Sequence, residues 1–174
     1  MKKTLLSLAI ASLAAGQSVC AAVEKVYNEP DSVYIFSYAH PEDEGRSGLK
    51  FAWSPDGDKW LSVSDGFAYL KCDFGRWGAE KRMIKPLLEK AEDGRWYCRW
   101  QLTPSGKVWG TSHSSDLLKW APQQYVNAEK PAMPRLVTAR QIVLDKDTLN
   151  GYMQKVPYAD IEQSVSYTHL RAHE

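Results

Sequence analysis

A segment with neither strand nor helix periodicity, residues 73–86, holds the side chains best suited to recognise a sugar. Trp77 stands beside Arg76, and Glu80 follows closely in the same segment. A tryptophan ring can stack on the apolar face of a sugar, while a guanidinium and a carboxylate can hydrogen-bond its hydroxyls. Irregular segments held between rigid elements often carry function. We therefore expect Arg76, Trp77 and Glu80 to contact a polysaccharide or oligosaccharide. The alternative is a plain, solvated connection.

A further candidate for substrate binding is His113, which directly precedes a sequence typical of a turn. A lone histidine at such a place is more often structural than catalytic. The chain has four histidines and no close spacing of Cys, His and Asp, so we expect no metal site. It also has no glycine-rich phosphate loop and no nucleophile elbow, and we expect no cofactor.

One short pattern occurs twice and indicates how the chain is built. Residues 54–60 and 114–120 both read Ser-x-Asp-x-x-Lys-Trp. A short Asp side chain can accept a hydrogen bond from its own backbone two residues on, which closes a tight turn. Asp-Gly also tolerates positive φ and can link two antiparallel strands. We therefore interpret Asp56 and Asp116 as residues that form turns rather than as catalytic acids.

Each copy of the pattern follows a turn with Asp, an apolar run, a glycine and a second apolar run. A repeat of this period, made of short strands, is typical of a β-propeller blade. The sequence thus predicts an all-β fold of antiparallel blades, about two in number. The expected strands are 33–38, 49–53, 59–63 and 68–72 in the first blade, and 87–90, 95–102, 107–112 and 119–122 in the second. All seven tryptophans lie between Trp53 and Trp120, and we expect most of them in the blade cores.

The N-terminus, residues 1–22, has the composition of a signal peptide. Lys2 and Lys3 form a positive start, and residues 5–15 form an apolar run too short to span a bilayer. We expect cleavage near residue 22, no membrane span, and a secreted or periplasmic product. Lipid attachment at Cys20 is the less favoured alternative, because the residue before it is bulky.

Two cysteines remain after the expected cleavage, Cys72 and Cys98. An oxidising compartment would allow a disulfide between them, and two buried thiols are the alternative. The chain of 174 residues has a formal net charge of +1 and no run of Lys or Arg, so we expect no nucleic-acid partner.

The composition of the chain changes after the second repeat. Residues 127–134 are polar and contain two prolines, which indicates a linker, and 136–144 is an expected strand. In 147–163 apolar residues recur at loose helical spacing, but Gly151 and Pro157 argue against one clean helix. We therefore divide the chain into a propeller-like segment over 23–126 and an irregular connector over 127–164. Residues 165–174 resemble one frame of an adapter used in sequencing libraries, so we expect the natural protein to continue after Ser164.

The repeated phrases resemble glycoside hydrolase family 43. The resemblance rests on Tyr34–Tyr38, on Gly48–Gly57 with Lys59-Trp60, and on Ser114–Trp120, and it extends over 31–120. It implies a five-bladed β-propeller, here truncated, in a secreted hydrolase of arabinose- or xylose-containing polysaccharides. The segment 73–86 is similar to a module of secreted arabinofuranosidases. Arabinose-containing glycans are therefore the expected substrate class.

The chain departs from this family at the position of the general base. The resemblance implies an Asp-Pro pair where this chain has Lys85-Pro86. Glycoside hydrolysis normally needs two carboxylates, and a lysine does not supply one. Either Glu80 is the replacement catalytic residue, or this part of the chain only binds and is inactive by itself. Two alternatives remain: a non-catalytic carbohydrate-binding module fused to a hydrolase, and a sialidase-type propeller.

Overall fold

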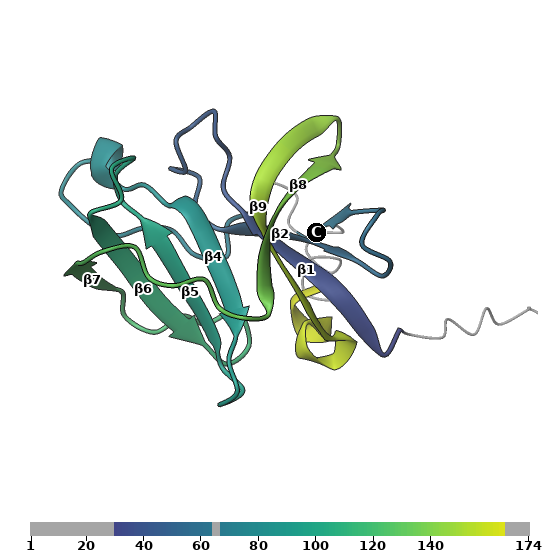
Figure 1. The fold of residues 1–174 in the computed structure, drawn as a ribbon. Helices are drawn as coiled ribbons and strands as arrows, with labels where there is room; N and C mark the ends of the chain where they lie inside the picture. The colour runs from purple at the N-terminus through teal and green to yellow at the C-terminus, as the bar shows by residue number, and fades with distance from the viewer. Residues whose placement is uncertain (1–29, 64–66, 166–174) are drawn as a thin grey trace, which may run out of the picture.

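The computed structural model describes residues 30–63 and 67–165, and this part of the chain forms two antiparallel β-sheets (Figure 1). The first sheet has the order β3-β2-β1-β9-β8, and the second has the order β4-β5-β6-β7. The expected all-β class is confirmed. The elements are β1 (Ser32–Tyr38), β2 (Lys50–Ser54), β3 (Leu61–Ser62), η1 (Gly78–Glu80), β4 (Ile84–Lys90), β5 (Trp96–Gln101), β6 (Val108–Ser114), β7 (Gln124–Asn127), β8 (Val137–Leu144), β9 (Asp147–Pro157) and η2 (Tyr158–Asp160).

The two sheets share one arrangement of strands. In the first, β1 pairs with β2 on one side and with β9 on the other; in the second, β5 pairs with β6 on one side and with β4 on the other. The repeated Ser-x-Asp-x-x-Lys-Trp pattern begins at the last residue of β2 and at the last residue of β6. Strand β9 therefore occupies, beside β1, the position that β4 occupies beside β5.

The turns formed by the two repeats have the same hydrogen bonds. Asp56 Oδ1 accepts from the hydroxyl of Ser54 and from the backbone N–H groups of residues 58 and 59. Asp116 Oδ1 accepts from the hydroxyl of Ser114 and from the N–H groups of residues 118 and 119. The interpretation of both aspartates as turn formers is confirmed.

These turns predict how stability depends on pH. Hydrogen bonds from the backbone N–H groups of Lys59 and Asp58 lower the pKa of Asp56 to about 2. Burial raises the pKa of Asp116, but the N–H groups of Lys119 and Leu118 outweigh it, and the pKa is lowered. Because the folded state holds both carboxylates ionised, their contribution is present above pH ~4 and lost as pH falls toward 2.

We expect the melting temperature to fall steadily between pH 5 and pH 2 in thermal scans. The double variant Asp56→Asn, Asp116→Asn keeps an acceptor oxygen at each turn but does not titrate, so its melting temperature should depend less on pH. An equal slope in the variant and the wild type would contradict this assignment.

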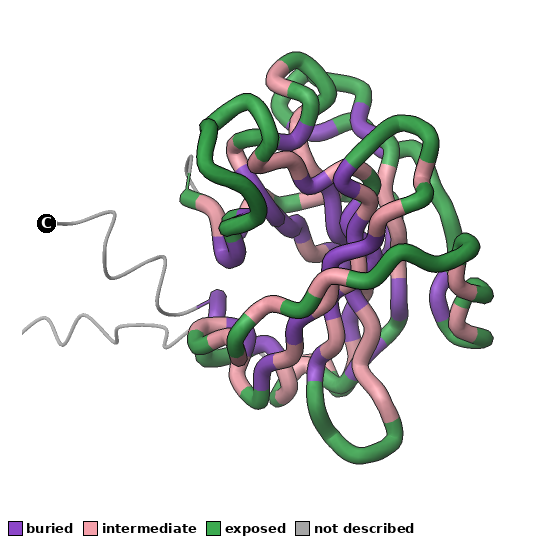
Figure 2. The backbone as a smooth tube through the Cα atoms, turned by 90° about the vertical axis from the view of Figure 1, so that its left-hand side faces the viewer, coloured by how far each residue is buried: buried purple, intermediate pink, exposed green. Residues whose placement is uncertain are grey.

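Most of the tryptophans lie in the core or pack against it, as expected. Trp96 and Trp100 are fully buried and Trp109 nearly so, whereas Trp77 is exposed. Figure 2 shows the buried backbone gathered along the strands and the exposed backbone in the peripheral loops. Trp60, which ends the first repeat, packs on Phe36 of β1 with ring centroids 5.5 Å apart. Most of the aromatic content therefore serves folding.

The C-terminal region differs from the sequence prediction. The expected strand 136–144 is confirmed as β8, but the expected irregular connector is wrong: β9 is the longest strand, and it lies between β1 and β8 (Figure 1). Gly151 is needed because β9 crosses close to β1, where a Cβ would overlap the carbonyl oxygen of Ser37. Pro157 lies at the last residue of the strand, where a missing N–H is tolerated. Both residues that argued against a helix thus fit a strand.

Several strand bounds in the two repeats also differ from expectation. The third strand is reduced to Leu61–Ser62, and within 68–72 only Leu70 forms a bridge, with Leu49. Strand β4 begins earlier than expected, at Ile84. Trp120 forms a bridge with Ser114, and the outer strand β7 follows it.

Two buried polar side chains fasten the sheets to each other. Ser37 of β1 donates to the carbonyl of Pro86 (3.1 Å) and accepts from the N–H of Leu88 (3.2 Å). Gln154 of β9 accepts from the N–H of Lys90 at 2.8 Å and donates to its carbonyl at 3.3 Å. Each side chain forms hydrogen bonds with the backbone of β4 that a neighbouring strand would otherwise form. These bonds hold β4 against the β1–β9 pair.

Cys72 and Cys98 are both buried free thiols, so they do not form the disulfide that an oxidising compartment would allow. The thiol of Cys72 lies 3.6 Å from the hydroxyl of Tyr125. Burial raises the pKa of Cys98 well above its ordinary value. No helix among the described residues is long and apolar enough to cross a bilayer. The expected signal peptide, Cys20 and residues 166–174 lie outside the described residues.

Candidate functional site

Strand β4 carries an irregularity at the residue that stands in place of the expected general base. The register between β4 and β5 shifts between Ile84 and Leu87, which marks a bulge. Within it, Lys85 has a φ of 50°, a left-handed conformation that costs energy for a residue other than glycine. Pro86 follows, and Ser37 holds its carbonyl in place. Strained positions of this kind gather at functional sites, so the bulge directs attention to Lys85.

Four cavities of the described part of the chain meet at this residue. Lys85 lines three open cavities, of about 320, 510 and 620 Å³, and a small fourth one. These volumes lie within or close to the range of small-molecule sites. We call the three larger cavities together the Lys85 cleft. The cleft surrounds the start of β4, with β8 and β9 on the side of the 510 Å³ cavity and the loop between β5 and β6 with the end of β7 on the side of the 620 Å³ cavity.

The smallest of the three cavities, of about 320 Å³, has the most apolar lining. The loop after β1 supplies one wall, with residues 39–41, Glu44 and Gly45, and the end of the segment 73–86 supplies the other. Gly45 approaches the chain closely: its carbonyl accepts from the N–H of Met83 at 3.1 Å, and its φ is 78°. A Cβ there would overlap the Met83 carbonyl oxygen, so the wall requires glycine.

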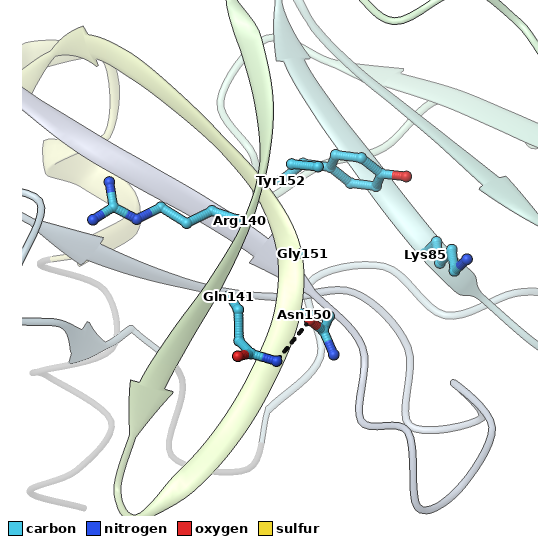
Figure 3. A pocket seen from close by; sticks show the side chains of 7 residues that line it. Lys85, Arg140, Gln141, Asn150, Gly151 and Tyr152 are labelled. Carbon is cyan, nitrogen blue, oxygen red and sulfur yellow. Dashed lines mark hydrogen bonds between the residues drawn. The ribbon is translucent and has the colours of Figure 1, made fainter.

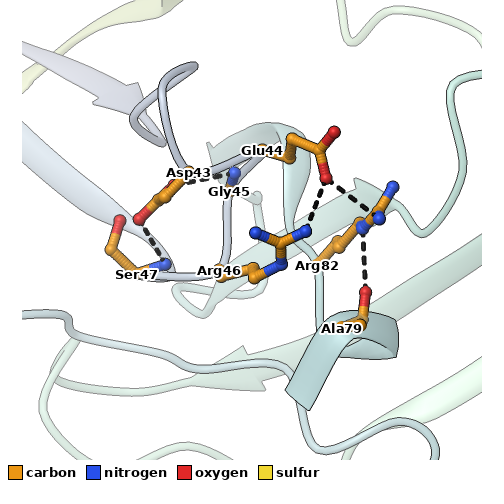
Figure 4. Close-up of polar contacts among 7 residues, drawn as sticks. All are labelled: Asp43, Glu44, Gly45, Arg46, Ser47, Ala79 and Arg82. Atoms are coloured by element: carbon orange, nitrogen blue, oxygen red, sulfur yellow. Dashed lines mark hydrogen bonds and ion pairs between the residues drawn. The ribbon is translucent and has the colours of Figure 1, made fainter. Parts of the chain in front are cut away.

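A network of charges fixes the rim of this cavity (Figure 4). Glu44 accepts from Arg46 at 2.8 Å and from Arg82 at 2.9 Å. Arg82 also donates from Nε to the carbonyl of Ala79 in η1, at 2.9 Å. Asp43 holds the same loop by accepting from the N–H groups of Gly45 and Ser47. The helix η1 is thereby tied to the wall of the cleft.

The second cavity, of about 510 Å³, lies over β8 and β9 (Figure 3). Tyr152 extends from β9 toward the strand that carries Lys85, and Asn150 accepts from Gln141 at 3.1 Å. Burial raises the pKa of the Tyr152 hydroxyl, which therefore stays protonated and able to donate. Arg140 points to the opposite side of β8 in this view. The lining thus offers amide and hydroxyl groups of the kind that bind sugar hydroxyls.

The third cavity, of about 620 Å³, is the most polar. Lys85, Lys107 and Lys130 contribute cations, and Glu129 contributes the one carboxylate of its lining. Uncharged polar groups complete it, namely Gln101, Ser105 and Asn127.

The sequence-predicted residues Arg76, Trp77 and Glu80 lie together in and beside η1. Trp77 is 69% exposed, the highest value, shared with Leu136, among the large hydrophobic residues that the structure describes. Glu80 folds back on the loop: its Oε2 accepts from the N–H of Arg76 at 3.0 Å and from the N–H of Trp77 at 3.2 Å. Its carboxylate thus fixes the backbone on either side of the Arg76–Trp77 peptide bond, and Glu80 is not among the residues that line the Lys85 cleft.

His113 is separated from these residues. It pairs with Tyr97, near the end of β5 and β6 where Trp96 faces Ser114, and its ring lies 5.7 Å from that of Tyr97. The segment 73–86 enters β4 at the opposite end, where Ile84 faces Gln101. The positions of Tyr97 and Gln101 along β5 are about 13 Å apart at the usual rise of a strand.

None of the three cavities of the Lys85 cleft is lined by two carboxylates of the described residues. Glu44 is the one carboxylate lining the 320 Å³ cavity, and it is engaged by two arginines. Glu129 is the one lining the 620 Å³ cavity, and the 510 Å³ cavity has none. The arrangement supplies hydrogen bonds, positive charge and an exposed aromatic ring. These are means of binding a polar ligand.

Sequence reasoning singled out Lys85 but missed Asn150 and Tyr152. Both belong to β9, a region whose periodicity gave no strand signal. Comparison of the chain with protein-family models, with curated proteins and with solved structures finds no match.

Proposed function

We propose that this chain is the glycan-binding part of a secreted glycoside hydrolase of the β-propeller type, acting on arabinose-containing polysaccharides. The observation that carries the proposal is the exposed Trp77 ring, held on a short helix that Arg82 ties to the wall of the Lys85 cleft. Exposed, oriented tryptophan rings bind sugar faces by stacking. The described residues bind without cleaving, because no cleft cavity is lined by two carboxylates.

The propeller architecture is supported by how the two sheets sit. In both the repeated sequence and the strand pairing, the pair β1-β2 corresponds to the pair β5-β6. Strand β9 beside β1 then corresponds to β4 beside β5. Gln154 and Ser37 bring these two partner strands together. In a propeller the corresponding strands of successive blades lie around a central axis where ligands bind. On this proposal, the Lys85 cleft opens beside that axis.

The first test is the Trp77→Ala variant. Losing a central aromatic contact typically costs about 2 kcal/mol, a roughly thirtyfold loss of affinity. We expect calorimetry with arabinan oligosaccharides to show this loss. Leu136→Ala, at an equally exposed hydrophobic position, is the matched control and should leave affinity unchanged. Unchanged affinity in Trp77→Ala would indicate that segment 73–86 is a plain, solvated connection without a role in binding.

The second test concerns hydrolysis by the protein itself. Because the Glu80 carboxylate is engaged by two backbone N–H groups, we expect the protein to release no arabinose from arabinan. Product analysis by chromatography checks this. Release of arabinose that Glu80→Gln abolishes would make Glu80 the replacement carboxylate and would overturn the binding-only role.

A further inference from the structure

The most polar cavity of the Lys85 cleft carries an excess of positive charge. Lys85, Lys107 and Lys130 line it with a single carboxylate, Glu129. None of the three lysines forms an ion pair with any residue that the structure describes. The formal net charge of the whole chain is only +1, so this cavity is a local concentration of positive charge.

The other cations near the cleft are already compensated. Arg82 is paired with Glu44, and Arg99, which lines the small fourth cavity, is paired with Glu89 at 3.1 Å. The chain thus neutralises the arginines around the cleft and leaves the lysines of one cavity available. An open cavity lined by unneutralised cations raises the local concentration of anions.

The backbone makes the position of Lys85 specific. Its φ of 50° and the bulge in β4 place it where all the cleft cavities meet, and Ser37 fixes the next residue. Around it, Gln101, Ser105 and Asn127 add amide and hydroxyl groups in the same cavity. An anionic charge surrounded by several hydroxyls is the complement of this lining.

We propose that the 620 Å³ cavity of the Lys85 cleft binds the carboxylate of a uronic acid residue in an acidic polysaccharide. A uronic acid has one carboxylate for the lysines and several hydroxyls for the amides. This inference deepens the proposed function and rests on it, since it names the acidic glycan class that the same cleft takes. Neutral arabinose units contact Trp77, and the acidic unit contacts Lys85.

The experiment compares a charged ligand with its neutral methyl ester. Calorimetry is carried out with a galacturonic acid trimer and with its methyl ester, which has the same ring and hydroxyls but no charge. We expect the acid to bind at least tenfold more tightly than the ester, and its affinity to fall with added salt. Equal affinity for acid and ester would overturn the inference.

The variant series assigns the effect to this cavity. Lys85→Met keeps the side-chain stem and the Cβ but removes the charge, and we expect a roughly tenfold loss of affinity for the acid. Lys85→Arg should retain most of the affinity, and Lys130→Met should show a similar loss to Lys85→Met. Lys119→Met, at an exposed lysine outside the cleft, should match the wild type. Wild-type affinity in both Lys85→Met and Lys130→Met would overturn the inference.

Two further arms separate this inference from the proposed function. Trp77→Ala should weaken binding of neutral arabinan oligosaccharides but should keep the preference for the acid over its methyl ester. If only the Trp77 effect is found, the acidic site is wrong and the proposed function stands. If only the acid binds, the acidic site stands and arabinan is not the ligand. A single-stranded oligonucleotide that binds as tightly as the acid would show a general polyanion site and contradict the inference.

Discussion

Replacing Gly151 with alanine should destabilise the protein by about 3 kcal/mol, because β9 has no room for a side chain where it crosses β1. A Cβ would overlap the carbonyl oxygen of Ser37 and would lie 2.6 Å from Cζ of Phe36. The oxygen belongs to the backbone of a central strand, and the Phe36 ring is fully buried, so neither can move aside. The strain would be released by pushing β9 away from β1.

Chemical denaturation measures the effect. Gly78→Ala is the matched control, because a Cβ at Gly78 meets nothing within 4 Å. We expect the control to lie within about 0.5 kcal/mol of the wild type. A Gly151→Ala protein as stable as Gly78→Ala would mean that β9 does not pack against β1 as described.

The second large effect is expected at Trp100. This side chain is fully buried in β5, and it faces Gly110 of β6 across the sheet. Its ring occupies the space where a Cβ of Gly110 would lie, so the two residues form one packed unit. Trp100→Ala removes the ring from above a residue that has no side chain to fill the gap. We expect a loss of about 4 kcal/mol.

Trp100→Phe separates ring packing from hydrogen bonding. The indole Nε1 of Trp100 has no hydrogen-bond partner among the described residues. A phenylalanine therefore loses no hydrogen bond and only part of the packing of the ring. We expect a loss of about 1.5 kcal/mol, well below that of the alanine variant. Denaturation midpoints of both variants check the prediction. Equal losses would show that the indole nitrogen, and not the ring, makes the main contribution.

The local structure was largely predictable from the sequence, and the reason is that turns are encoded locally. The repeated Ser-x-Asp-x-x-Lys-Trp pattern predicts both turns because each uses hydrogen bonds within five residues of the chain. The apolar runs likewise predict β2 and β5. At the second turn, Leu117 takes the position of Gly57 with a φ of 63°, since its buried side chain adds to the core.

The pairing of β9 with β1 was not predictable in this way. The contact joins residues more than a hundred positions apart, such as Ser37 and Tyr152, and no local pattern encodes it. Gly151 and Pro157 suggest a break in the chain when β9 is considered alone. Their fit to a strand is visible only once β1 lies beside it.

The candidate site was predictable in part for the same reason. Trp77 and Arg76 are neighbours in sequence, so their shared loop was evident. Lys85 stood out because the resemblance implied an aspartate at its position. The cleft itself combines the loop around Glu44, the bulge in β4 and the middle of β9. The carboxylate of Glu80 accepts hydrogen bonds from the backbone of its own loop. The residue type alone does not show that this carboxylate is engaged there and not in the cleft.

The most direct test of the account is to map where a glycan binds. An arabinan oligosaccharide is titrated into the ¹⁵N-labelled protein, and the indole and amide signals are followed by nuclear magnetic resonance. We expect the indole signal of Trp77 to shift most, together with the amides of Arg82 and Lys85, while His113 and the turn at Asp116 stay unchanged. Shifts confined to the His113 side of the second sheet, or no shifts at saturating glycan, would contradict the proposal that this cleft and its exposed tryptophan bind carbohydrate.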